Sequence, residues 1–509
     1  MKRYLLTLLL ILAVLLSGCG DATTDIIEEV PVSCAHVDIN DDGNCDACGI
    51  YVIVAIDFYV INDLHGKFAD TDAQPGVDEL TTYLKNARAT DDNVVLLASG
   101  DMWQGSSESN LTKGSIITDW MNEMDFASMT LGNHEYDWGE DYVEANAAAA
   151  EFPLLAINVY DRATNERVDY CEPSVMVEVG GATVGIIGAI GDCYSSIAGD
   201  KVEDIYFKTG DELTALVKAE AERLRAAGAD MIVYSIHDGH GSSLSSLTSL
   251  SNSQIRSYYD HSLSDGYVDL VFEGHTHQRY VFMDSYGVYH LQNGGDNKGI
   301  SHVEIAVNIA NDNTRVNEAE FVPTSKYTSL SDDPIVQTLL DKYEDKIAVA
   351  DRVLGVNDTH RDRDSLRRLV AQLYLETGLS YWGDQYDIVL GGGYLSVRSP
   401  GYLARGEVKY ADLQMLFPFD NQLTLCSISG ANLKSRFINS TNSNYFMAYG
   451  EYGNSVKNAI DPNATYYIIV DSYSSSYAPN RLTVVDTYDP DVFARDLLAA
   501  YVEAGGLGK

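Results

Sequence analysis

The sequence predicts an α/β fold with two domains. Strand-like apolar runs alternate with helix-like stretches over most of the chain, polar residues directly follow several of these runs, and a second alternating region follows an apparent connecting helix. The chain has 509 residues, 45% of them hydrophobic, which is ample for more than one core.

Residues 1–19 are predicted to be a lipoprotein signal peptide. Lys2 and Arg3 precede an apolar run at 4–16, and small residues follow before Cys19. This pattern is typical of secretory signals, and Leu16-Ser17-Gly18-Cys19 resembles a bacterial lipobox. Cleavage would leave Cys19 as a lipid-bearing N-terminus that holds the protein at the membrane, outside the cytoplasm. The alternative is plain secretion with an incidental cysteine. Residues 20–33, which are acidic, are predicted to form a tether.

Residues 34–50 are predicted to form a small metal knuckle. Three cysteines and one histidine lie close together there and can close a tetrahedral site for one structural zinc ion: Cys34, His36, Cys45 and Cys48. A disulfide beside a polar turn is the alternative in an oxidising compartment. Neither interpretation gives this segment a catalytic role.

Residues 51–327 are predicted to be the catalytic domain. Strands are expected at 52–61, 94–98, 126–131, 231–236 and 268–272, and helices at 77–89, 115–123, 140–150 and 211–227. Each expected strand ends in a polar loop: Asn62-Asp63-Leu64-His65-Gly66, Ser99-Gly100-Asp101, Gly132-Asn133-His134-Glu135-Tyr136-Asp137, Ile236-His237-Asp238 and Gly274-His275-Thr276-His277. Since ligands collect at the carboxyl ends of strands in α/β sheets, these loops are expected to face one crevice.

The donor atoms in these loops favour a hydrolytic metal site. Carboxylate, amide and imidazole ligands suit Zn, Mn or Fe. There are seven candidate ligands: Asp63, His65, Asp101, Asn133, His237, His275 and His277. That number is too large for one tetrahedral ion and indicates two divalent ions, about 3.5–4 Å apart, that share a carboxylate.

The ordered motifs Asp-x-His, Gly-Asp, Gly-Asn-His-Glu, His and Gly-His-x-His resemble the calcineurin-like metallophosphoesterases. More narrowly, Asn-Asp-Leu-His-Gly and the C-terminal features resemble the 5'-nucleotidase family, which includes UDP-sugar hydrolases and 2',3'-cyclic-nucleotide phosphodiesterases. The resemblance covers roughly residues 54–505 and implies a four-layer α/β/β/α sandwich followed by a substrate domain. It implies that Asp101 bridges two metals, one also bound by Asp63, His65 and His277, the other by Asn133, His237 and His275.

The same resemblance gives His134 a role without a metal. His134 would stabilise the transition state or assist the leaving oxygen, and Asp137 would orient it. Relatives that hydrolyse cyclic phosphodiesters often carry Asn at the position of Asp137. The Asp therefore favours the monoesterase branch.

Residues 328–350 are expected to form one connecting helix and residues 351–509 a second α/β domain, with helices at 366–377 and 491–503 and a strand at 466–470. This domain would select the substrate. Pro418-Phe419-Asp420-Asn421 resembles the family's Pro-Phe-Gly-Asn, whose Phe stacks on a base, and Tyr473 stands where the family has a second aromatic residue. Asn421 would bond a base edge.

Two arginines are expected at the phosphate or carboxylate end of that substrate. Arg361 matches a family Arg that precedes the next helix, and Arg363 is an additional candidate. Arg398 follows the family's Gly-Gly-Gly loop (391–393), but Tyr-Leu-Ser-Val intervenes. The family's Gly-Gly-Asp-Gly after the second aromatic residue is missing as well. Both departures affect residues that would contact the substrate, so the family's nucleotide preference does not carry over directly to this chain.

The charge of the chain narrows the class of partner. Seventy-five acidic and 34 basic residues give a formal charge of −41, which argues against a nucleic-acid polymer as ligand. Metals and a few arginines can still attract a small nucleotide. The sequence thus predicts an extracytoplasmic two-metal phosphoester hydrolase, most simply a 5'-nucleotidase. UDP-sugar or 2',3'-cyclic-nucleotide hydrolysis is the alternative, and a non-catalytic surface nucleotide-binding protein a remote one.

Overall fold

The computed structural model describes residues 37, 44–47, 52–70, 75–255, 258–398, 400–438, 446–450, 460–477, 481–489 and 492–508. Cys19, the tether, Cys34, His36 and Cys48 lie outside the described residues, so the anchor and the knuckle stay predictions. Cys45 is described and is buried. Within the described ranges, no helix combines the length and apolar character needed to cross a membrane.

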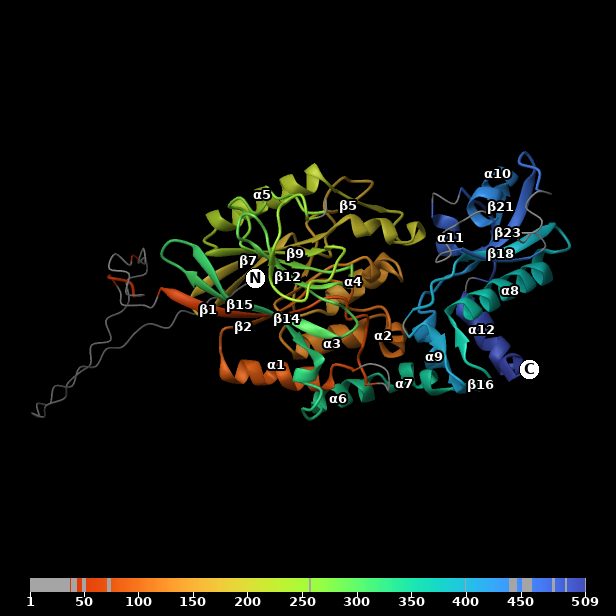
Figure 1. Cartoon of the computed structure of the whole chain (residues 1–509), viewed down its shortest axis with the longest axis horizontal. Helices are drawn as coiled ribbons and strands as arrows, with labels where there is room; N and C mark the ends of the chain where they lie inside the picture. Colours follow the sequence, from red (N-terminus) through yellow and green to blue (C-terminus); the bar gives the residue numbers. More distant parts are fainter. Residues whose placement is uncertain are drawn as a thin grey trace, which may run out of the picture.

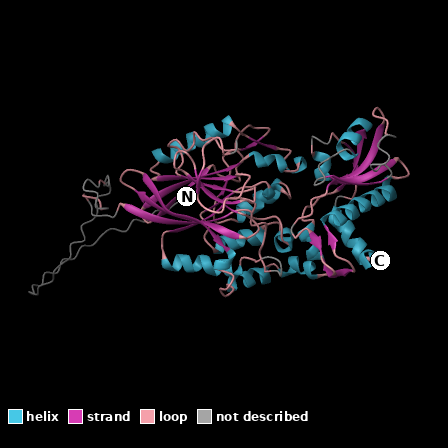
Figure 2. Cartoon of the chain, viewed as in Figure 1, coloured by secondary structure: helices cyan, strands magenta, loops and turns pink. Residues whose placement is uncertain are grey.

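Two sheets form the centre of the catalytic domain (Figures 1 and 2). The six-stranded sheet has the order β15-β14-β1-β2-β3-β4 and the seven-stranded sheet the order β10-β12-β13-β11-β9-β7-β6. The strands of the first are β1 (Ile53–Ile61), β2 (Val94–Ala98), β3 (Ser128–Thr130), β4 (Leu154–Leu155), β14 (Gly299–Asn308) and β15 (Asn313–Pro323). Those of the second are β6 (Ser174–Val179), β7 (Ala182–Ile190), β9 (Met231–His237), β10 (Thr248–Ser249), β11 (Leu270–Glu273), β12 (Arg279–Met283) and β13 (Tyr289–Asn293).

Alternate side chains along the strands form the core between the two sheets. Along β1, Val54, Ile56 and Phe58 face the second sheet, where they meet alternate residues of β9 such as Val233. β1, β2 and β3 are parallel to one another, and so are β7, β9 and β11. The carboxyl ends of the strands that carry the predicted loops therefore meet at one edge of each sheet.

Helices cover both outer faces, which makes the domain the predicted four-layer α/β/β/α sandwich. α1 (Asp78–Thr90), α3 (Ser115–Glu123) and α4 (Glu140–Ala149) pack through residues such as Leu84, Trp120 and Val143 on the six-stranded sheet. α5 (Asp211–Ala226) packs through Val217 and Leu224 on the seven-stranded sheet. These four helices lie within a residue of their predicted bounds. Smaller elements are α2 (Ser107–Thr112) and the pair β5 (Val159–Asp161) and β8 (Ile205–Phe207).

The connecting segment differs from the single helix expected at 328–350. It forms α6 (Pro334–Lys342), α7 (Glu344–Ile347) and a 3-10 turn, Ala348–Asp351. The helix begins late because Pro334 occupies its first turn and the side chain of Asp333 caps it by accepting a hydrogen bond from Ile335 N. Lys85 on α1 donates to Asp333, which ties this start to the catalytic domain.

The C-terminal domain is the second α/β unit (Figure 1). Its five-stranded sheet has the order β22-β18-β23-β21-β24, with bounds Phe446–Gly450, Ile388–Tyr394, Thr465–Asp471, Leu423–Ser429 and Thr483–Thr487. Two short pairs are β16 (Val353–Asn357) with β20 (Gly406–Lys409), and β17 (Arg361–Asp362) with β19 (Tyr402–Leu403). Its helices are α8 (Arg363–Trp382), α9 (Tyr410–Leu416), α10 (Gly430–Asn432), α11 (Ser472–Ser476) and α12 (Ala494–Glu503).

The three glycines 391–393 lie within strand β18, not in a loop. A Cβ atom at Gly391 would lie 2.4 Å from the carbonyl oxygen of Ala371 on α8. Glycine is required there because the helix backbone passes directly over the strand. Tyr394 is the last residue of β18, and Arg398 follows the strand.

Candidate metal centre and substrate cavity

The predicted loops converge at the carboxyl ends of β1, β2, β3, β9 and β11. Backbone hydrogen bonds join the first two loops, with Asp63 N donating to Gly100 O at 2.9 Å and His65 N donating to Asp101 O at 3.0 Å. Five of the seven candidate ligands have a left-handed backbone with φ between 50° and 65°: Asp63, His65, Asp101, His275 and His277. Non-glycine residues adopt this conformation at an energetic cost, and such strain gathers at functional sites.

Asp63, His65 and His277 form one cluster, with ligand atoms within 4.8 Å of one another. The Nε2 atoms of His65 and His277 are 2.9 Å apart, and Nε2 of His277 is 3.2 Å from Oδ1 of Asp63. The other ring nitrogen of His65 faces the carbonyl oxygen of Gln104 at 3.0 Å. That contact favours the proton on Nδ1 and leaves the Nε2 lone pair for a metal.

Asp101 and His237 belong to a second cluster. Nε2 of His237 lies 3.0 Å from Oδ2 of Asp101, yet neither atom makes a hydrogen bond within the described part of the chain, and both residues are buried. Nδ1 of His237 instead bonds to Ser99 O at 2.7 Å. Nearby, Nδ1 of His275 is 2.9 Å from Oδ1 of Asn133. Oδ2 of Asp101 and Nε2 of His237 are thus buried polar atoms without partners, which fits a role as metal ligands, and ligand atoms of His237 and His275 lie within 4.8 Å of each other.

The carboxylates of the two clusters are ionised, as metal ligands need to be. Burial opposes ionisation of Asp63, but His277 and His237 outweigh it and lower the pKa of Asp63 to about 2. In the same way, His237 and His134 overcome burial and hold the pKa of Asp101 well below its usual value. The donor set therefore fits two divalent ions.

His134 lies beside these clusters and is held by two acidic residues. Its Nδ1 is 2.7 Å from Oδ2 of Asp137, and its backbone N–H donates to Oδ1 of Asp101 at 2.8 Å. Burial lowers the pKa of His134, but Asp137 and Asp101 outweigh burial and raise it. Among the described residues, Nε2 of His134 makes no hydrogen bond, so this atom is available to a substrate oxygen.

Glu135 has a structural role that the motif analysis did not assign. It is fully buried, and its carboxylate accepts hydrogen bonds from the backbone N–H groups of Gly132 (2.7 Å), Asp101 (2.9 Å) and Met102 (2.8 Å). Burial and the nearby Asp101 raise the pKa of Glu135 to about 7. This side chain ties the β2 loop to the β3 loop. Its place inside Gly-Asn-His-Glu was the sequence signal that could have identified it.

A cavity of about 500 Å³ lies between the two domains. Asn133, His134, Asp137, Ser195, Ser196, Ala198, Lys201 and His275 line it from the catalytic domain, and Tyr394, Ser396, Arg398, Phe419, Asn421, Tyr473 and Tyr477 from the C-terminal domain. Four of the five predicted substrate residues are therefore at this cavity. The Phe419 ring stacks on His134, and the Arg398 guanidinium carbon is 5.8 Å from the centre of the Phe419 ring.

Arg361 does not line this cavity. It lies on β17, and its Nε donates to Oδ1 of Asn357 at 3.2 Å. Arg363 instead lines a neighbouring cavity of about 260 Å³, together with Arg398, Lys67, Asp296 and the metal-cluster residues His65 and His277. The lining of the interdomain cavity also includes Tyr394, Tyr477 and Lys201, to which no sequence motif points except for Tyr394, which directly follows the three glycines.

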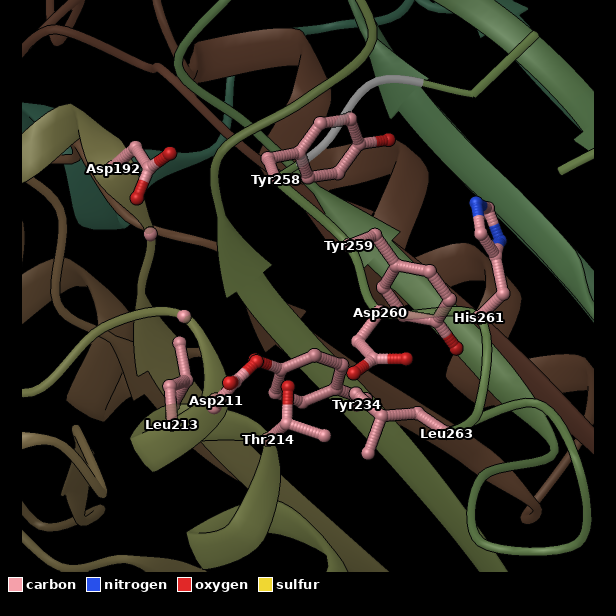
Figure 3. Close-up of a pocket in the computed structure, with 12 residues that line it drawn as sticks. Asp192, Asp211, Leu213, Thr214, Tyr234, Tyr258, Tyr259, Asp260, His261 and Leu263 are labelled. Atoms are coloured by element: carbon pink, nitrogen blue, oxygen red, sulfur yellow. The ribbon is translucent and has the colours of Figure 1, made fainter. Parts of the chain in front are cut away.

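Figure 3 shows a third cavity, of about 340 Å³, lined by Tyr234, Tyr258, Tyr259 and Asp260 among others. Tyr234 and His237 are both on β9, but Tyr234 packs in the core beneath α5 whereas Ser235 and His237 point to the other sheet. None of the predicted site residues lines this third cavity. The metal-ligand clusters and the interdomain cavity are therefore the candidate site.

The comparisons with known proteins agree with this geometry. Residues 56–279, which contain all seven candidate ligands, match the calcineurin-like phosphoesterase family. Human 5'-nucleotidase is 23% identical over 444 residues, which are 77% of this chain and 72% of that protein. Protein UshA of Yersinia enterocolitica is 25% identical over 477 residues, covering 80% and 82%.

Solved structures show the same fold over both domains. A putative 5'-nucleotidase from Staphylococcus aureus superposes with a TM-score of 0.69 at 19% identity, covering 89% of this chain and 98% of that one. The sulfate thiohydrolase SoxB from Thermus thermophilus gives 0.63 at 16% identity, covering 89% and 94%. The catalytic unit is thus a calcineurin-like phosphoesterase domain, and the protein is a metal-dependent phosphoester hydrolase.

Proposed function

We propose that the protein is a 5'-nucleotidase that releases phosphate from nucleoside monophosphates. The observation that carries this proposal is the stacking of Phe419 on His134, with ring centroids 5.8 Å apart. An aromatic ring from the C-terminal domain thereby borders the same cavity as the candidate metal ligands Asn133 and His275. A phosphate at the metal centre and a base against Phe419 would be parts of one molecule.

The two metal positions follow from the donor clusters. One would be held by Asp63, His65, Asp101 and His277, the other by Asp101, Asn133, His237 and His275, with Asp101 shared. When bound, divalent ions at these positions supply Lewis acidity to the phosphoryl group and to the attacking water. The residues of the chain fix the geometry, since Glu135 holds the backbone of Asp101 and Gly132 in place.

His134 would act on the substrate through its Nε2. Nδ1 of His134 lies 2.7 Å from Oδ2 of Asp137, and Asp137 with Asp101 outweighs burial and raises the pKa of His134. The charged imidazolium can then donate from Nε2 to a phosphoryl oxygen or to the leaving 5'-oxygen. The base would lie between Phe419 and Tyr473, which both line the cavity, and Asn421 would bond its edge. Such stacking is worth about 1–3 kcal/mol per base and tolerates different bases.

UDP-sugars are a second candidate, favoured by the neighbouring cavity of about 260 Å³. Lys67, Arg363 and Arg398 line it beside His65 and His277, and these cations suit a second phosphoryl group. Arg361 lines neither of these two cavities. For 2',3'-cyclic nucleotides, the Asp at 137 is the unfavourable feature.

We also propose that the protein works outside the cytoplasm, anchored by lipid at Cys19. Support comes from the sequence of residues 1–19, with its basic start, apolar run and Leu-Ser-Gly-Cys. The knuckle of Cys34, His36, Cys45 and Cys48 would bind one structural zinc ion between the tether and the catalytic domain. Labelling with a radioactive fatty acid, with Cys19→Ser as control, tests the anchor.

Phosphate release from AMP by the purified protein with Mn²⁺ tests the main proposal. UDP-glucose and 2',3'-cyclic AMP are assayed in parallel, and Asp101→Asn is the matched control because it keeps the shape of the bridging side chain. Release from AMP that disappears in the control and after EDTA supports the 5'-nucleotidase. Activity on another substrate alone moves the assignment to that substrate, and metal-dependent release from none of them contradicts it and favours a non-catalytic nucleotide-binding protein.

A further inference from the structure

Asp420 occupies an unusual position between two cations from different domains. It pairs with Arg495 of α12 and with Lys113 of the catalytic domain. The Asp420 side chain is 10% exposed and that of Arg495 is 4% exposed, so solvent screens the Asp420–Arg495 ion pair weakly. Burial raises the pKa of Asp420, but Arg495 and Lys113 outweigh it and keep the pKa below its usual value. The carboxylate is therefore charged at neutral pH.

Lys113 is held firmly on the catalytic side. It ends α2 in a left-handed conformation, with φ of 53°, and its carbonyl oxygen accepts a hydrogen bond from Asn146 at 2.8 Å. Its Nζ lies 5.3 Å from the centre of the Trp138 ring, and Trp138 directly follows Asp137. Cation–π contact of this kind fixes the direction of a long side chain. Lys113 is thus a preformed point of attachment beside the catalytic loop.

Arg495 holds the other side of the contact. Besides Asp420, its Nη1 donates to the carbonyl oxygens of Phe417 (3.2 Å) and Phe419 (3.1 Å). The backbone on both sides of Phe419 is therefore bound to the same guanidinium group that carries Asp420. Through Asp420 and Arg495, Lys113 is therefore connected to the backbone of Phe419.

Residue 420 is where this segment departs from the family motif that it resembles. The motif Pro418-Phe419-Asp420-Asn421 departs from the Pro-Phe-Gly-Asn that it resembles at residue 420 alone. A glycine there has no side chain that could reach Lys113. The ion pair therefore comes from the one substitution in the segment, and that substitution directly follows the aromatic residue that stacks on His134.

We propose that Lys113 and Asp420 are positioning residues: their ion pair joins the two domains and holds the Phe419 ring over His134, where it receives the base of the substrate. This inference rests on the proposed function in one respect, the identity of the group that stacks on Phe419. A second polar contact between the domains, Asn110 Nδ2 to Gln414 Oε1 at 3.4 Å, is longer and uncharged. The ion pair is accordingly the stronger of these two links.

Comparing two substrates tests the proposal. Lys113→Met and Asp420→Asn remove one charge each, and kcat/KM is measured for AMP and for β-glycerophosphate, which has no ring to stack on Phe419. We expect kcat/KM for AMP to fall by about tenfold, mainly through KM, which corresponds to the lower end of the stabilisation that base stacking provides. For β-glycerophosphate we expect kcat/KM to change by less than about twofold. Lys113→Arg should retain most of the AMP activity. Lys85→Met is the matched control, since it removes the Lys85–Asp333 ion pair far from Phe419.

Equal losses of kcat/KM on both substrates would overturn the proposal. So would a ratio of kcat/KM for AMP to kcat/KM for β-glycerophosphate that is the same in Lys113→Met as in wild type. If the wild type hydrolyses β-glycerophosphate but not AMP, the nucleotide assignment has failed and the ion pair is judged by small-angle X-ray scattering. Lys113→Met should then scatter as a more open two-domain particle at low salt, and wild type should approach that curve as salt screens the pair. A Lys113→Met curve identical to wild type would overturn the positioning role independently of any substrate.

Discussion

The Phe419 ring lies over the imidazole of His134, with 5.8 Å between the ring centroids and 25° between the planes. The two residues belong to different domains, and each is fixed on its own side. His134 is held by Asp137 and Asp101, and the backbone of Phe419 is held by Arg495. The stack brings the expected base-binding residue to the residue expected to act on the phosphate.

Replacing Phe419 with Leu should therefore weaken recognition of the base more than catalysis. We expect kcat/KM for AMP to fall by about tenfold, mainly through KM, because the aromatic face is lost while a side chain of similar size remains. Phe419→Tyr keeps the ring and should stay close to wild type. A fall in kcat alone, with KM unchanged, would show that Phe419 acts on His134 instead of on the base.

The gathering of the candidate metal ligands could be predicted from the sequence because each of them sits in a short motif directly after a strand. Asp63 and His65 follow β1, Asp101 follows β2, and His237 ends β9, so local order and parallel pairing are enough to bring them together. The alternation of strands and helices predicts an α/β layer fold, and the family resemblance implies its four-layer form. Structure added the left-handed backbone of five ligands and the carboxylate of Glu135, which depend on contacts between loops.

The substrate side was less predictable because it depends on how two domains meet. Arg361 and Arg363 differ by two residues, yet one is on β17 and the other begins α8, so that only Arg363 lines a cavity next to the metal ligands. Sequence spacing does not locate the boundary between a strand and the following helix to within two residues. The contact of Lys113 could not be predicted from the sequence either, since its partner Asp420 is in the other domain.

Glu135→Gln should reduce metal retention. The amide would turn an N–H group toward backbone N–H donors of Asp101 and Gly132, so the two loops that carry the ligands would separate. We expect metal affinity to fall by about 10- to 100-fold, as for other residues that orient metal ligands. Metal content after dialysis, measured by inductively coupled plasma mass spectrometry, checks this, with exposed Glu123→Gln as control. Full retention in Glu135→Gln would contradict the role given to this carboxylate.

Asp471 predicts a pH-dependent stability of the C-terminal domain. Burial raises the pKa of Asp471 to about 6, so the folded state holds this proton more tightly than the unfolded chain. The stabilisation is complete below pH 4 and is lost as the pH rises through about 6, with a span of up to about 3 kcal/mol. Asp471→Asn removes the titration and can still accept the hydrogen bond from Ser474 N that caps α11.

The melting temperature of wild type should therefore fall between pH 4 and pH 7 by more than that of Asp471→Asn. Asp345→Asn, at an exposed site on α7, removes the same charge without burial and serves as the control. Parallel melting curves for wild type and Asp471→Asn over this range would show that Asp471 ionises without penalty in the folded protein.

Asp137→Asn should impair turnover and leave the metals in place. The neutral amide no longer supports the charged form of His134, whose Nδ1 lies 2.7 Å from the carboxylate in wild type. We expect kcat for AMP to fall by about 10²-fold with little change in KM, within the range for removal of an oriented general acid. Metal content should equal that of wild type, because Asp137 contacts His134 and is not among the candidate ligands. If metal were lost together with activity, Asp137 would instead be part of the scaffold of the metal centre, and the role of His134 would need a direct test with His134→Gln.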